Sequence, residues 1–253
     1  MKLGLIYNIS KYLGFTRLLL GFPEAFLILG DKKIYFNNYN SAGIFTKAYV
    51  EALSKVNIYK ECDCYIDVGA HMGDKSFWFH EYNKDAEVAV FEPNPVMFGL
   101  LERNLRHIKD LRKYCVALGS EEGEINIYSD PMHLDTASLN ESSYYLKNNA
   151  EGELQSTKVK VKRLDSYIDE FKNKQNIYLK IDVETFEREL LKGAQEFIKN
   201  VKYLEIEVSQ DDHNHFSEIF SLIPREFNLL ECDVLRSKNL TFPRVATLLL
   251  ELK

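Results

Sequence analysis

The residues with the clearest chemical potential form a short glycine-containing run after a predicted strand. Asp67-Val68-Gly69-Ala70-His71-Met72-Gly73 lies between the apolar stretch Cys64–Val68 and a helical stretch. Gly69 lets the backbone approach a ligand closely, and Gly73 permits a tight entry into the helix. The carboxylate of Asp67 disfavours a pyrophosphate here and favours a ligand that carries an ammonium group. We therefore predict that this loop holds a small ligand.

Two further runs at predicted strand ends extend this site. Phe91-Glu92-Pro93-Asn94-Pro95 places an acid where its carboxylate can accept both hydroxyls of a ribose. Val116-Ala117-Leu118-Gly119 offers small and apolar side chains that could flank an adenine ring. Each run alone also fits a structural role, as a helix cap, a solvated strand end or ordinary core. Their order and spacing together favour an adenosine-containing ligand.

Another strand end carries three charged residues, Lys180, Asp182 and Glu184, which share one side because strand residues alternate. Burying such charges without partners is costly, so they must pair, face solvent, bind a metal or contact a substrate. Two close carboxylates could hold Mg²⁺, or one could act as a base while the other orients it. The alternative is an ion pair from Lys180 to a carboxylate that only supports the sheet.

These runs require a sheet that brings several strand ends together. The predicted strands are Cys64–Val68, Glu87–Phe91, Tyr114–Leu118, Ile177–Val183 and Tyr203–Val208. Helices are predicted over Pro95–His107, with Asn94 as the N-cap, and over Phe186–Ile198. This alternation indicates an α/β fold with a doubly wound, mostly parallel Rossmann-like sheet. The runs Phe227–Val234 and Val245–Leu252 are predicted to form an antiparallel C-terminal pair at one sheet edge.

The sequence pattern changes near residue 60. Before this point, Phe26–Phe36 is typical of a hairpin that turns at Gly30 and Asp31, and a helix is predicted from about Ser41. We therefore expect an N-terminal cap of hairpin and helix over residues 1–60. The ligand-binding domain is expected over residues 61–253.

The amino-acid composition limits which kinds of molecule the protein is expected to bind. The chain has 253 residues, 45% of them hydrophobic, and a net charge of −6 without any block of Lys and Arg. This balance argues against nucleic acid or an anionic membrane as partner and favours a small molecule or glycan. Charged residues interrupt the apolar first thirty positions, so we expect a cytoplasmic protein without stable membrane insertion. Leu18–Leu20 could contribute to a homodimer contact or to a contact at a membrane edge. The four cysteines are expected to be reduced thiols.

Taken together, the motifs resemble the FkbM family of methyltransferases. The runs that carry the resemblance are Asp67–Gly73, Phe91–Pro95, Val116–Gly119, Leu164-Asp165 and Lys180–Glu184 followed by Leu191–Ala194. The resemblance covers roughly Tyr65 to Val208 and implies a class I fold that uses S-adenosylmethionine, commonly to O-methylate sugars or glycosylated products. The cofactor residues expected from the motifs and the resemblance are Asp67, Gly69, Ala70, His71, Met72, Gly73, Ser76, Glu92, Pro93, Asn94, Ala117 and Leu118.

The sequence departs from the family pattern at two positions. His71 stands where the family usually has Asn, and Thr185 stands where Gly usually follows the acid. A histidine can still donate or accept a hydrogen bond, so cofactor binding is little affected. Thr185 matters more, because a β-branched residue resists a positive φ and adds bulk beside the cleft. Either the turn or the acceptor is expected to differ here.

Methyl transfer to a hydroxyl needs alignment and a group that removes the proton. The catalytic candidates are Asp182, Glu184, Lys180 and His213, with Asp182 and Glu184 as the candidate ligands of Mg²⁺. The long loop Asp130–Asn149 carries the candidate substrate residues His133, Asp135, Ser138 and Tyr144. We predict O-methylation of a sugar in a surface polysaccharide, in its nucleotide-sugar precursor or in a glycosylated metabolite.

Two other classes of protein remain as alternatives. A non-catalytic protein that binds an adenosyl ligand is compatible with Thr185. A nicotinamide-dependent oxidoreductase would use the same fold, but it requires a Gly-x-Gly-x-x-Gly turn that the run Asp67–Gly73 does not contain. Binding of S-adenosylmethionine, NADH fluorescence and methyl incorporation into sugars separate the three.

Overall fold

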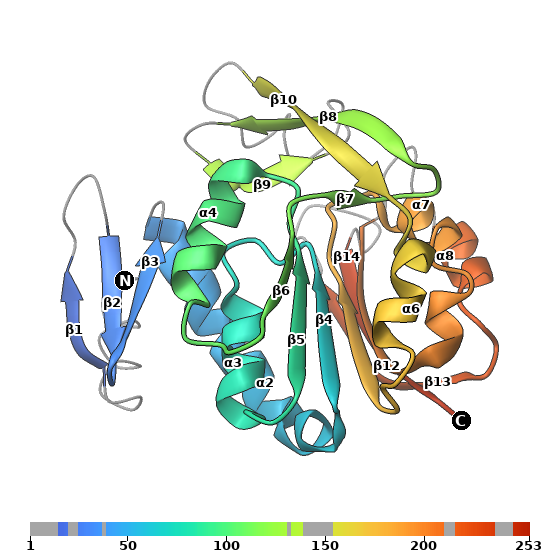
Figure 1. Cartoon of the computed structure of the whole chain (residues 1–253), viewed down its shortest axis with the longest axis horizontal. Coiled ribbons are helices and arrows are strands. Elements are labelled where there is room, and N and C mark those ends of the chain that lie inside the picture. The colour runs from blue at the N-terminus through green and yellow to red at the C-terminus, as the bar shows by residue number, and fades with distance from the viewer. Residues whose placement is uncertain are drawn as a thin grey trace.

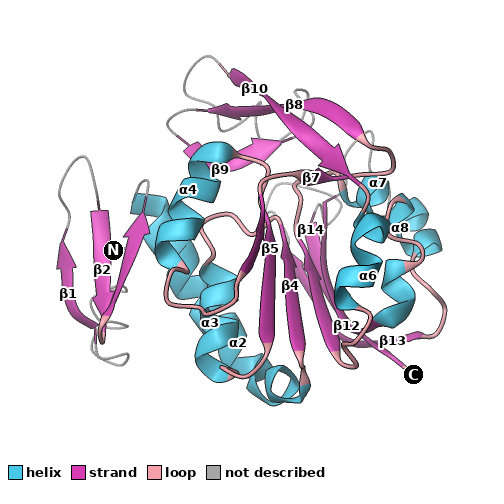
Figure 2. Ribbon diagram, in the orientation of Figure 1, coloured by secondary structure: helices cyan, strands magenta, loops and turns pink. Residues whose placement is uncertain are grey.

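The computed structural model describes residues 15–19, 25–36, 39–130, 133–138, 154–209, 216–235 and 245–253. Its centre is a seven-stranded sheet with the strand order β13-β14-β12-β11-β4-β5-β6 (Figure 1). The parallel strands are β4 (Cys64–Val68), β5 (Glu87–Phe91), β6 (Arg112–Tyr114), β11 (Ile177–Ile181) and β12 (Val201–Ser209). Helices cover both faces, which confirms the predicted doubly wound fold (Figure 2).

The strand order places a ligand crevice between β4 and β11. Along the chain, the five parallel strands are arranged 3-2-1-4-5, as in nucleotide-binding Rossmann sheets. The order reverses between the first and the fourth of them, which are β4 and β11. Ligands of open α/β sheets bind beyond the carboxyl ends of the strands at this switch point. At the other edge, β13 (Phe227–Leu235) and β14 (Val245–Leu252) form the predicted antiparallel pair.

Two hydrophobic cores hold the layers together, one on each face of the sheet. The helices α2 (Tyr39–Glu61), α3 (Asp74–Tyr82) and α4 (Pro95–Asn104) cover one face. The other face carries α6 (Ile168–Phe171), α7 (Glu187–Lys192) and α8 (Phe216–Leu222), with the short 3-10 helices η1 (Leu164–Tyr167) and η2 (Phe197–Asn200). Central strands β4 and β11 are buried along their whole length, as expected for parallel strands covered on both sides.

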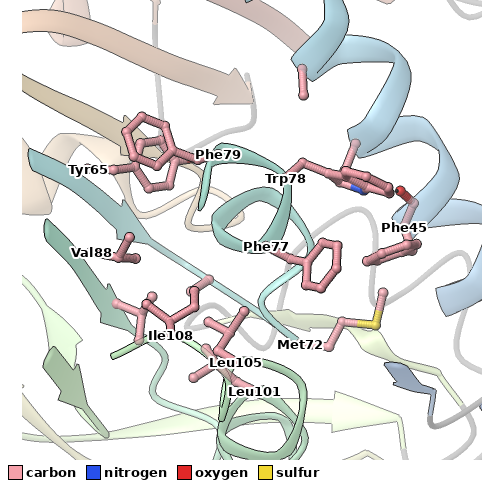
Figure 3. Close-up of a cluster of buried hydrophobic side chains, with 14 of the residues drawn as sticks. Phe45, Tyr65, Met72, Phe77, Trp78, Phe79, Val88, Leu101, Leu105 and Ile108 are labelled. Carbon is pink, nitrogen blue, oxygen red and sulfur yellow. Dashed lines mark hydrogen bonds between the residues drawn. The ribbon is translucent and has the colours of Figure 1, made fainter. Parts of the chain in front are cut away.

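Aromatic packing fixes α2 and α3 against the sheet (Figure 3). Tyr65 of β4 stacks on Phe79 of α3 with ring centroids 4.3 Å apart. The indole N–H of Trp78 donates a hydrogen bond to the backbone oxygen of Phe45 in α2, at 3.1 Å. Because large buried aromatic side chains contribute much of a core's stability, this cluster holds α2 in a fixed place beside the site.

The N-terminal hairpin is present as predicted, with one additional strand. β2 (Ala25–Leu29) and β3 (Lys32–Phe36) turn at Gly30, whose φ of 60° suits glycine. β1 (Phe15–Leu19), which the sequence did not predict, pairs with β2. The Asn104 side chain of α4 bonds to both backbone polar groups of Tyr35 and so anchors β3. No helix in the described part of the chain is long and apolar enough to cross a membrane.

A second sheet, of order β7-β10-β8-β9, was missed by the sequence patterns. Its strands are β7 (Ala117–Leu118), β8 (Gly123–Asp130), β9 (His133–Ser138) and β10 (Gln155–Lys162). The prediction of one strand over Tyr114–Leu118 was wrong, because β6 ends at Tyr114 and β7 pairs with β10. Part of the expected loop Asp130–Asn149 is also strand β9. The small sheet lies beyond the carboxyl ends of β4 and β5 (Figure 1).

The predicted helix Phe186–Ile198 is shorter than expected. Helix α7 ends at Lys192, and its C-cap, Gly193, lies against another backbone segment. A Cβ atom on Gly193 would come within 1.9 Å of the backbone oxygen of Gly119. The Asp165 carboxylate then accepts the two backbone N–H groups that begin η2, at 2.9 and 3.0 Å. Asp165, one of the motif residues, therefore caps this element.

Candidate functional site

A cavity of about 260 Å³ opens at the carboxyl ends of β4, β5 and β11. Its lining includes Gly69, Glu92 and Asp182, so the switch point does bring three of the predicted runs together. Ala117 and Leu118 of β7 and Ile127 of β8 line it as well. The cavity thus lies between the central sheet and the small second sheet.

The loop after β4 depends on glycine at one position of close approach. Gly69 has a φ of 73°, and a Cβ atom there would lie 1.7 Å from the backbone oxygen of Asp182. The backbone N–H groups of Gly69 and Ala70 both donate to the Phe91 oxygen, at 3.0 Å. Because no larger residue fits, this contact fixes how far apart the ends of β4, β5 and β11 lie.

His71 continues the loop in a left-handed conformation with a φ of 53°. Histidine is among the non-glycine residues that tolerate this region best, so the left-handed turn can form at His71. Its ring nitrogen lies 3.8 Å from Asp74, which lines the cavity at the start of α3. Burial acts to raise the pKa of Asp74, but the His71 contact and nearby lysines hold it below its ordinary value.

Asp67 lies beneath the loop and does not line the cavity. Its side chain is fully buried, accepts a hydrogen bond from Ser76 at 2.6 Å and pairs with the Lys180 ammonium at 3.2 Å. We expected this carboxylate to favour a ligand ammonium, but Asp67 is not among the residues that line the cavity, so it is not placed to contact a ligand there directly. Met72, Gly73 and Ser76 also lie outside the lining. These residues support the loop from below.

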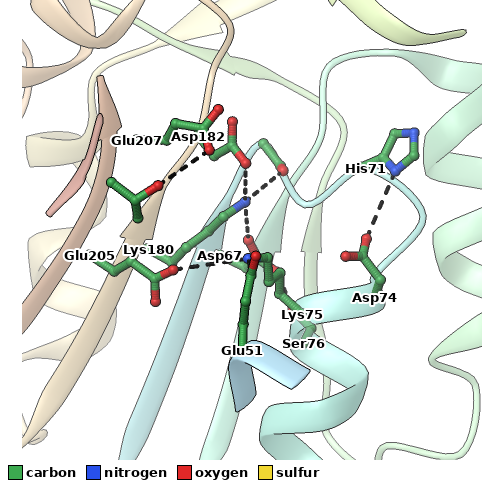
Figure 4. Close-up of polar contacts among 12 residues, drawn as sticks. Glu51, Asp67, His71, Asp74, Lys75, Ser76, Lys180, Asp182, Glu205 and Glu207 are labelled. Atoms are coloured by element: carbon green, nitrogen blue, oxygen red, sulfur yellow. Dashed lines mark hydrogen bonds and ion pairs between the residues drawn. The ribbon is translucent and has the colours of Figure 1, made fainter. Parts of the chain in front are cut away.

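Lys180 joins the two central strand ends (Figure 4). Its ammonium contacts Asp67, the Gly69 oxygen at 3.1 Å and Asp182 at 3.5 Å. Burial alone would lower the pKa of Lys180, but the two carboxylates outweigh burial and raise it, so the residue stays charged. The ion pair that the sequence left as an alternative is therefore present, and it reaches into the cavity through Asp182.

The Glu92 carboxylate lines the cavity and is held in place by backbone hydrogen bonds. One oxygen accepts the backbone N–H of His71 and the other that of Asn94, each at 2.8 Å. Asn94 in turn caps α4 by accepting from Val96 at 3.0 Å. Burial raises the pKa of Glu92, against the effect of these hydrogen bonds. Each oxygen has a second lone pair, so the group can still accept two hydroxyls of a ribose.

The wall beside Glu92 is apolar. Phe91, Met97, Ala117, Leu118 and Ile127 line this end of the cavity. Ala117 and Leu118 were predicted to flank an adenine ring, and both are present here. Ile127 was missed, because its strand belongs to the second sheet. An acid flanked by an apolar slot fits an adenosine ligand, with the ribose at Glu92 and the base among the apolar side chains.

Three carboxylates, Asp182, Glu184 and Glu207, meet at the opposite wall. The charge of Asp182, followed by burial, raises the pKa of Glu207 to about 7. Burial, followed by Asp182 and Glu207, raises the pKa of Glu184 well above its ordinary value. Such carboxyl groups can take up a proton near neutral pH. Sequence reasoning missed Glu207. A signal was present, because Glu205 and Glu207 on β12 are charged residues at alternate positions, as Lys180 and Asp182 are at the end of β11.

The turn after Asp182 keeps a glycine-like shape without glycine. Glu184 and Thr185 have φ values of 49° and 79°, both in the left-handed region. The Thr185 hydroxyl is buried and makes no hydrogen bond within the described structure. The turn therefore forms in spite of the β-branched side chain, at a conformational cost of about 1–3 kcal/mol per strained residue.

Several predicted residues cannot be placed in the site. His213 and Tyr144 lie outside the described residues. His133, Asp135 and Ser138 belong to β9, but their side chains are outside the description. Within the part of the chain that is described, no group of three or more His, Cys, Asp or Glu side chains is placed to hold a metal ion. The Mg²⁺ predicted at Asp182 and Glu184 has no support there.

The chain matches the family model described as the methyltransferase FkbM domain over residues 67–234. No curated protein matches it. Among solved structures, precorrin-6y C5,15-methyltransferase from Geobacter metallireducens has a TM-score of 0.45 and 9% identity, covering 82% of this chain and 88% of that chain. The N-methyltransferase NodS from Bradyrhizobium japonicum has a TM-score of 0.46 and 6% identity, and the match covers 81% of this chain and 94% of NodS. A SAM-dependent methyltransferase from Agrobacterium tumefaciens has a TM-score of 0.47 and 12% identity, and the match covers 94% of this chain and 72% of that protein.

Proposed function

This chain belongs to the FkbM family of S-adenosylmethionine-dependent methyltransferases, and from that premise we propose that its acceptor is a sugar hydroxyl. The sugar belongs to a surface polysaccharide, to its nucleotide-linked precursor or to a glycosylated metabolite. The observation that carries the cofactor assignment is Glu92, whose two carboxylate oxygens are fixed by backbone N–H groups and face an apolar slot. This arrangement suits a ribose joined to an adenine.

We propose that the cofactor is held by the loop from Gly69 to His71, by Glu92 with its neighbours Pro93 and Asn94, and by Ala117 and Leu118. All of these except Ala70 line the cavity. Asp67, Met72, Gly73 and Ser76 act from beneath, by keeping the loop in shape. When bound, S-adenosylmethionine supplies a methyl group on a positively charged sulfur.

The carboxylates at the opposite wall are proposed to remove the acceptor proton. Transfer to a hydroxyl releases one proton, which needs a nearby base whose pKa lies close to the working pH. Asp182, Glu184 and Glu207 line the cavity, and Glu207 has a pKa of about 7. Lys180 orients Asp182 through their ion pair. The Lys180 ammonium already supplies positive charge beside Asp182, so the proposed proton transfer includes no metal ion.

The acceptor is proposed to enter beneath the small sheet. His133, Asp135 and Ser138 on β9, and Tyr144 beyond it, remain the candidate sugar contacts, and His213 remains a candidate base. Residues 1–60 are proposed to act as a cap on the domain 61–253, since α2 contributes Ile44 and Ala48 to the cavity wall. A homodimer contact through Leu18–Leu20 stays a prediction.

The test is methyl incorporation from labelled S-adenosylmethionine into a panel of free, nucleotide-linked and polymeric sugars. We expect a sugar product with wild-type protein and loss of at least 95% of turnover in Asp182→Asn, with affinity for S-adenosylhomocysteine retained. Cofactor binding without any methylated sugar would favour the non-catalytic alternative. A methylated amine or carboxylate in place of a hydroxyl would contradict the sugar proposal.

A further inference from the structure

Helix α2 turns one face toward the cavity. Ile44, Lys47, Ala48 and Glu51 all line it, and their spacing of three, four and seven residues is that of a single helical stripe. The stripe is held in place, because Trp78 bonds to the α2 backbone and Glu51 pairs with Lys75 of α3. These four residues precede residue 67, where the family match begins.

The cavity is apolar at one end and charged at the other. The apolar end, beside Glu92, takes the adenosine in the function proposed above. The remaining lining comes from α2, from the start of α3 and from the ends of β4, β11 and β12, and it carries Lys47, Glu51, Lys75, Asp182 and Glu207. A ligand with an adenosine at one end and a zwitterionic amino acid at the other can bind in one orientation, with the adenosine at the apolar end and the amino acid at the charged end. Its amino-acid end must lie between α2 and β11.

Three lysines line the charged end, and two of them already have strong internal partners. Lys180 contacts Asp67, Asp182 and the Gly69 oxygen. Lys75 pairs with Glu51 and lies 4.0 Å from Glu205, and these carboxylates raise its pKa despite burial. Turning Lys180 toward a ligand would leave the buried Asp67 without a cation, which is costly. Lys75 is mostly buried between two carboxylates and would have to leave both of them.

Lys47 is different, because its ammonium is easily released. Its only described ion pair is with Glu51, at 3.3 Å on the same helix, and its side chain is 62% exposed. Exposed pairs of this kind contribute little stability, about 0.3–0.5 kcal/mol. Glu51 also keeps Lys75 as a partner, so it would not be left alone. Lys47 can therefore bind an incoming anion at small cost.

We propose that Lys47 binds the carboxylate of the cofactor's amino-acid end, while Glu51 faces its ammonium. The inference rests on the proposed cofactor site and adds to it a residue from α2. It assigns α2 a recognition role, in which the helix discriminates complete S-adenosyl amino acids from ligands that carry only the adenosine and thioether.

The inference is tested by calorimetric titration with two probes that share the adenosine. S-adenosylhomocysteine has the amino acid, and 5′-methylthioadenosine lacks it. Lys47→Met, which keeps the chain length but removes the charge, should bind S-adenosylhomocysteine about tenfold more weakly. Its affinity for 5′-methylthioadenosine should change less than twofold. Lys47→Arg should restore most of the loss.

Lys60→Met is the matched control, because Lys60 is exposed in the last turn of α2 and does not line the cavity. It should bind both probes like the wild type. Equal losses for both probes in Lys47→Met, or no loss for either, would overturn the inference while leaving the cofactor site intact. A wild-type protein that binds neither probe would overturn the cofactor site itself, and the role of Lys47 with it.

Discussion

Replacing Lys180 by methionine should destabilise the whole protein. Lys180 is only 3% exposed, and its ammonium is the one cation paired with the fully buried Asp67 in the described structure. Methionine fills similar space but leaves Asp67 with the Ser76 hydroxyl as its remaining partner. The second carboxylate, Asp182, is 29% exposed and can turn toward water. The main cost therefore falls on Asp67.

The size of the effect follows from the distance. At an effective dielectric constant of about 20, two unit charges separated by the 3.2 Å between Lys180 and Asp67 attract by roughly 5 kcal/mol. Removing one partner of a buried ion pair typically costs about 3–5 kcal/mol. We therefore expect the free energy of unfolding to fall by about 4 kcal/mol, which is a large part of the roughly 5–15 kcal/mol of an ordinary domain.

Urea denaturation of Lys180→Met, Asp67→Asn and the double variant measures this cost. The double variant should be more stable than Lys180→Met, because no buried charge is left alone. Burial already raises the pKa of Asp67, and losing Lys180 must raise it further. The folded variant then binds a proton more readily than the unfolded chain, so its deficit should shrink as the pH falls through this raised pKa. A Lys180→Met protein of wild-type stability that cannot methylate would refute the reasoning and make Lys180 a purely catalytic residue.

Three further variants probe the site. Thr185→Gly should raise the unfolding free energy by about 1 kcal/mol and the melting temperature by about 2–4 °C, because the residue has a φ of 79°. An unchanged or lower melting temperature would contradict the backbone strain at this residue. Glu92→Ala should weaken S-adenosylhomocysteine about a hundredfold in calorimetry, since two hydrogen bonds to a charged group are lost. Methyl transfer should increase as the pH rises through about 7, where Glu207 loses its proton and becomes able to accept another. Glu207→Gln should remove this step from the profile of kcat/KM against pH, and a profile that stays unchanged would exclude Glu207 as the base.

Local patterns predicted the sheet well and identified several residues that line the cavity. β4, β5 and β14 have the predicted bounds, because each is a short apolar run between clear breaks. Gly69 and Glu92 could be placed at the cavity from the sequence, because the strand–turn–helix pattern determines where each strand ends. The N-cap Asn94 followed by proline is a similarly local signal.

Features that depend on distant contacts could not be predicted. β7 has two residues and exists because it pairs with β10 more than thirty residues later. Asp67 looked like a ligand contact, since nothing in its own run shows that Ser76 and Lys180 enclose it. Glu207 enters the site only because β12 lies beside β11, and Lys47 only because α2 packs on α3. In each case the deciding neighbour lies on another element.

The position of β14 has a consequence for how the protein is made. β14 pairs with β12 on one side and with β13 on the other, so an interior place in the sheet is filled by residues 245–252. During synthesis, β4, β5, β11 and β12 leave the ribosome with the far edge of β12 still open, and β12 carries Glu205 and Glu207. Exposed strand edges invite pairing with other chains. The arrival of β14 therefore covers this edge of β12, and β13 becomes the edge strand on that side of the sheet.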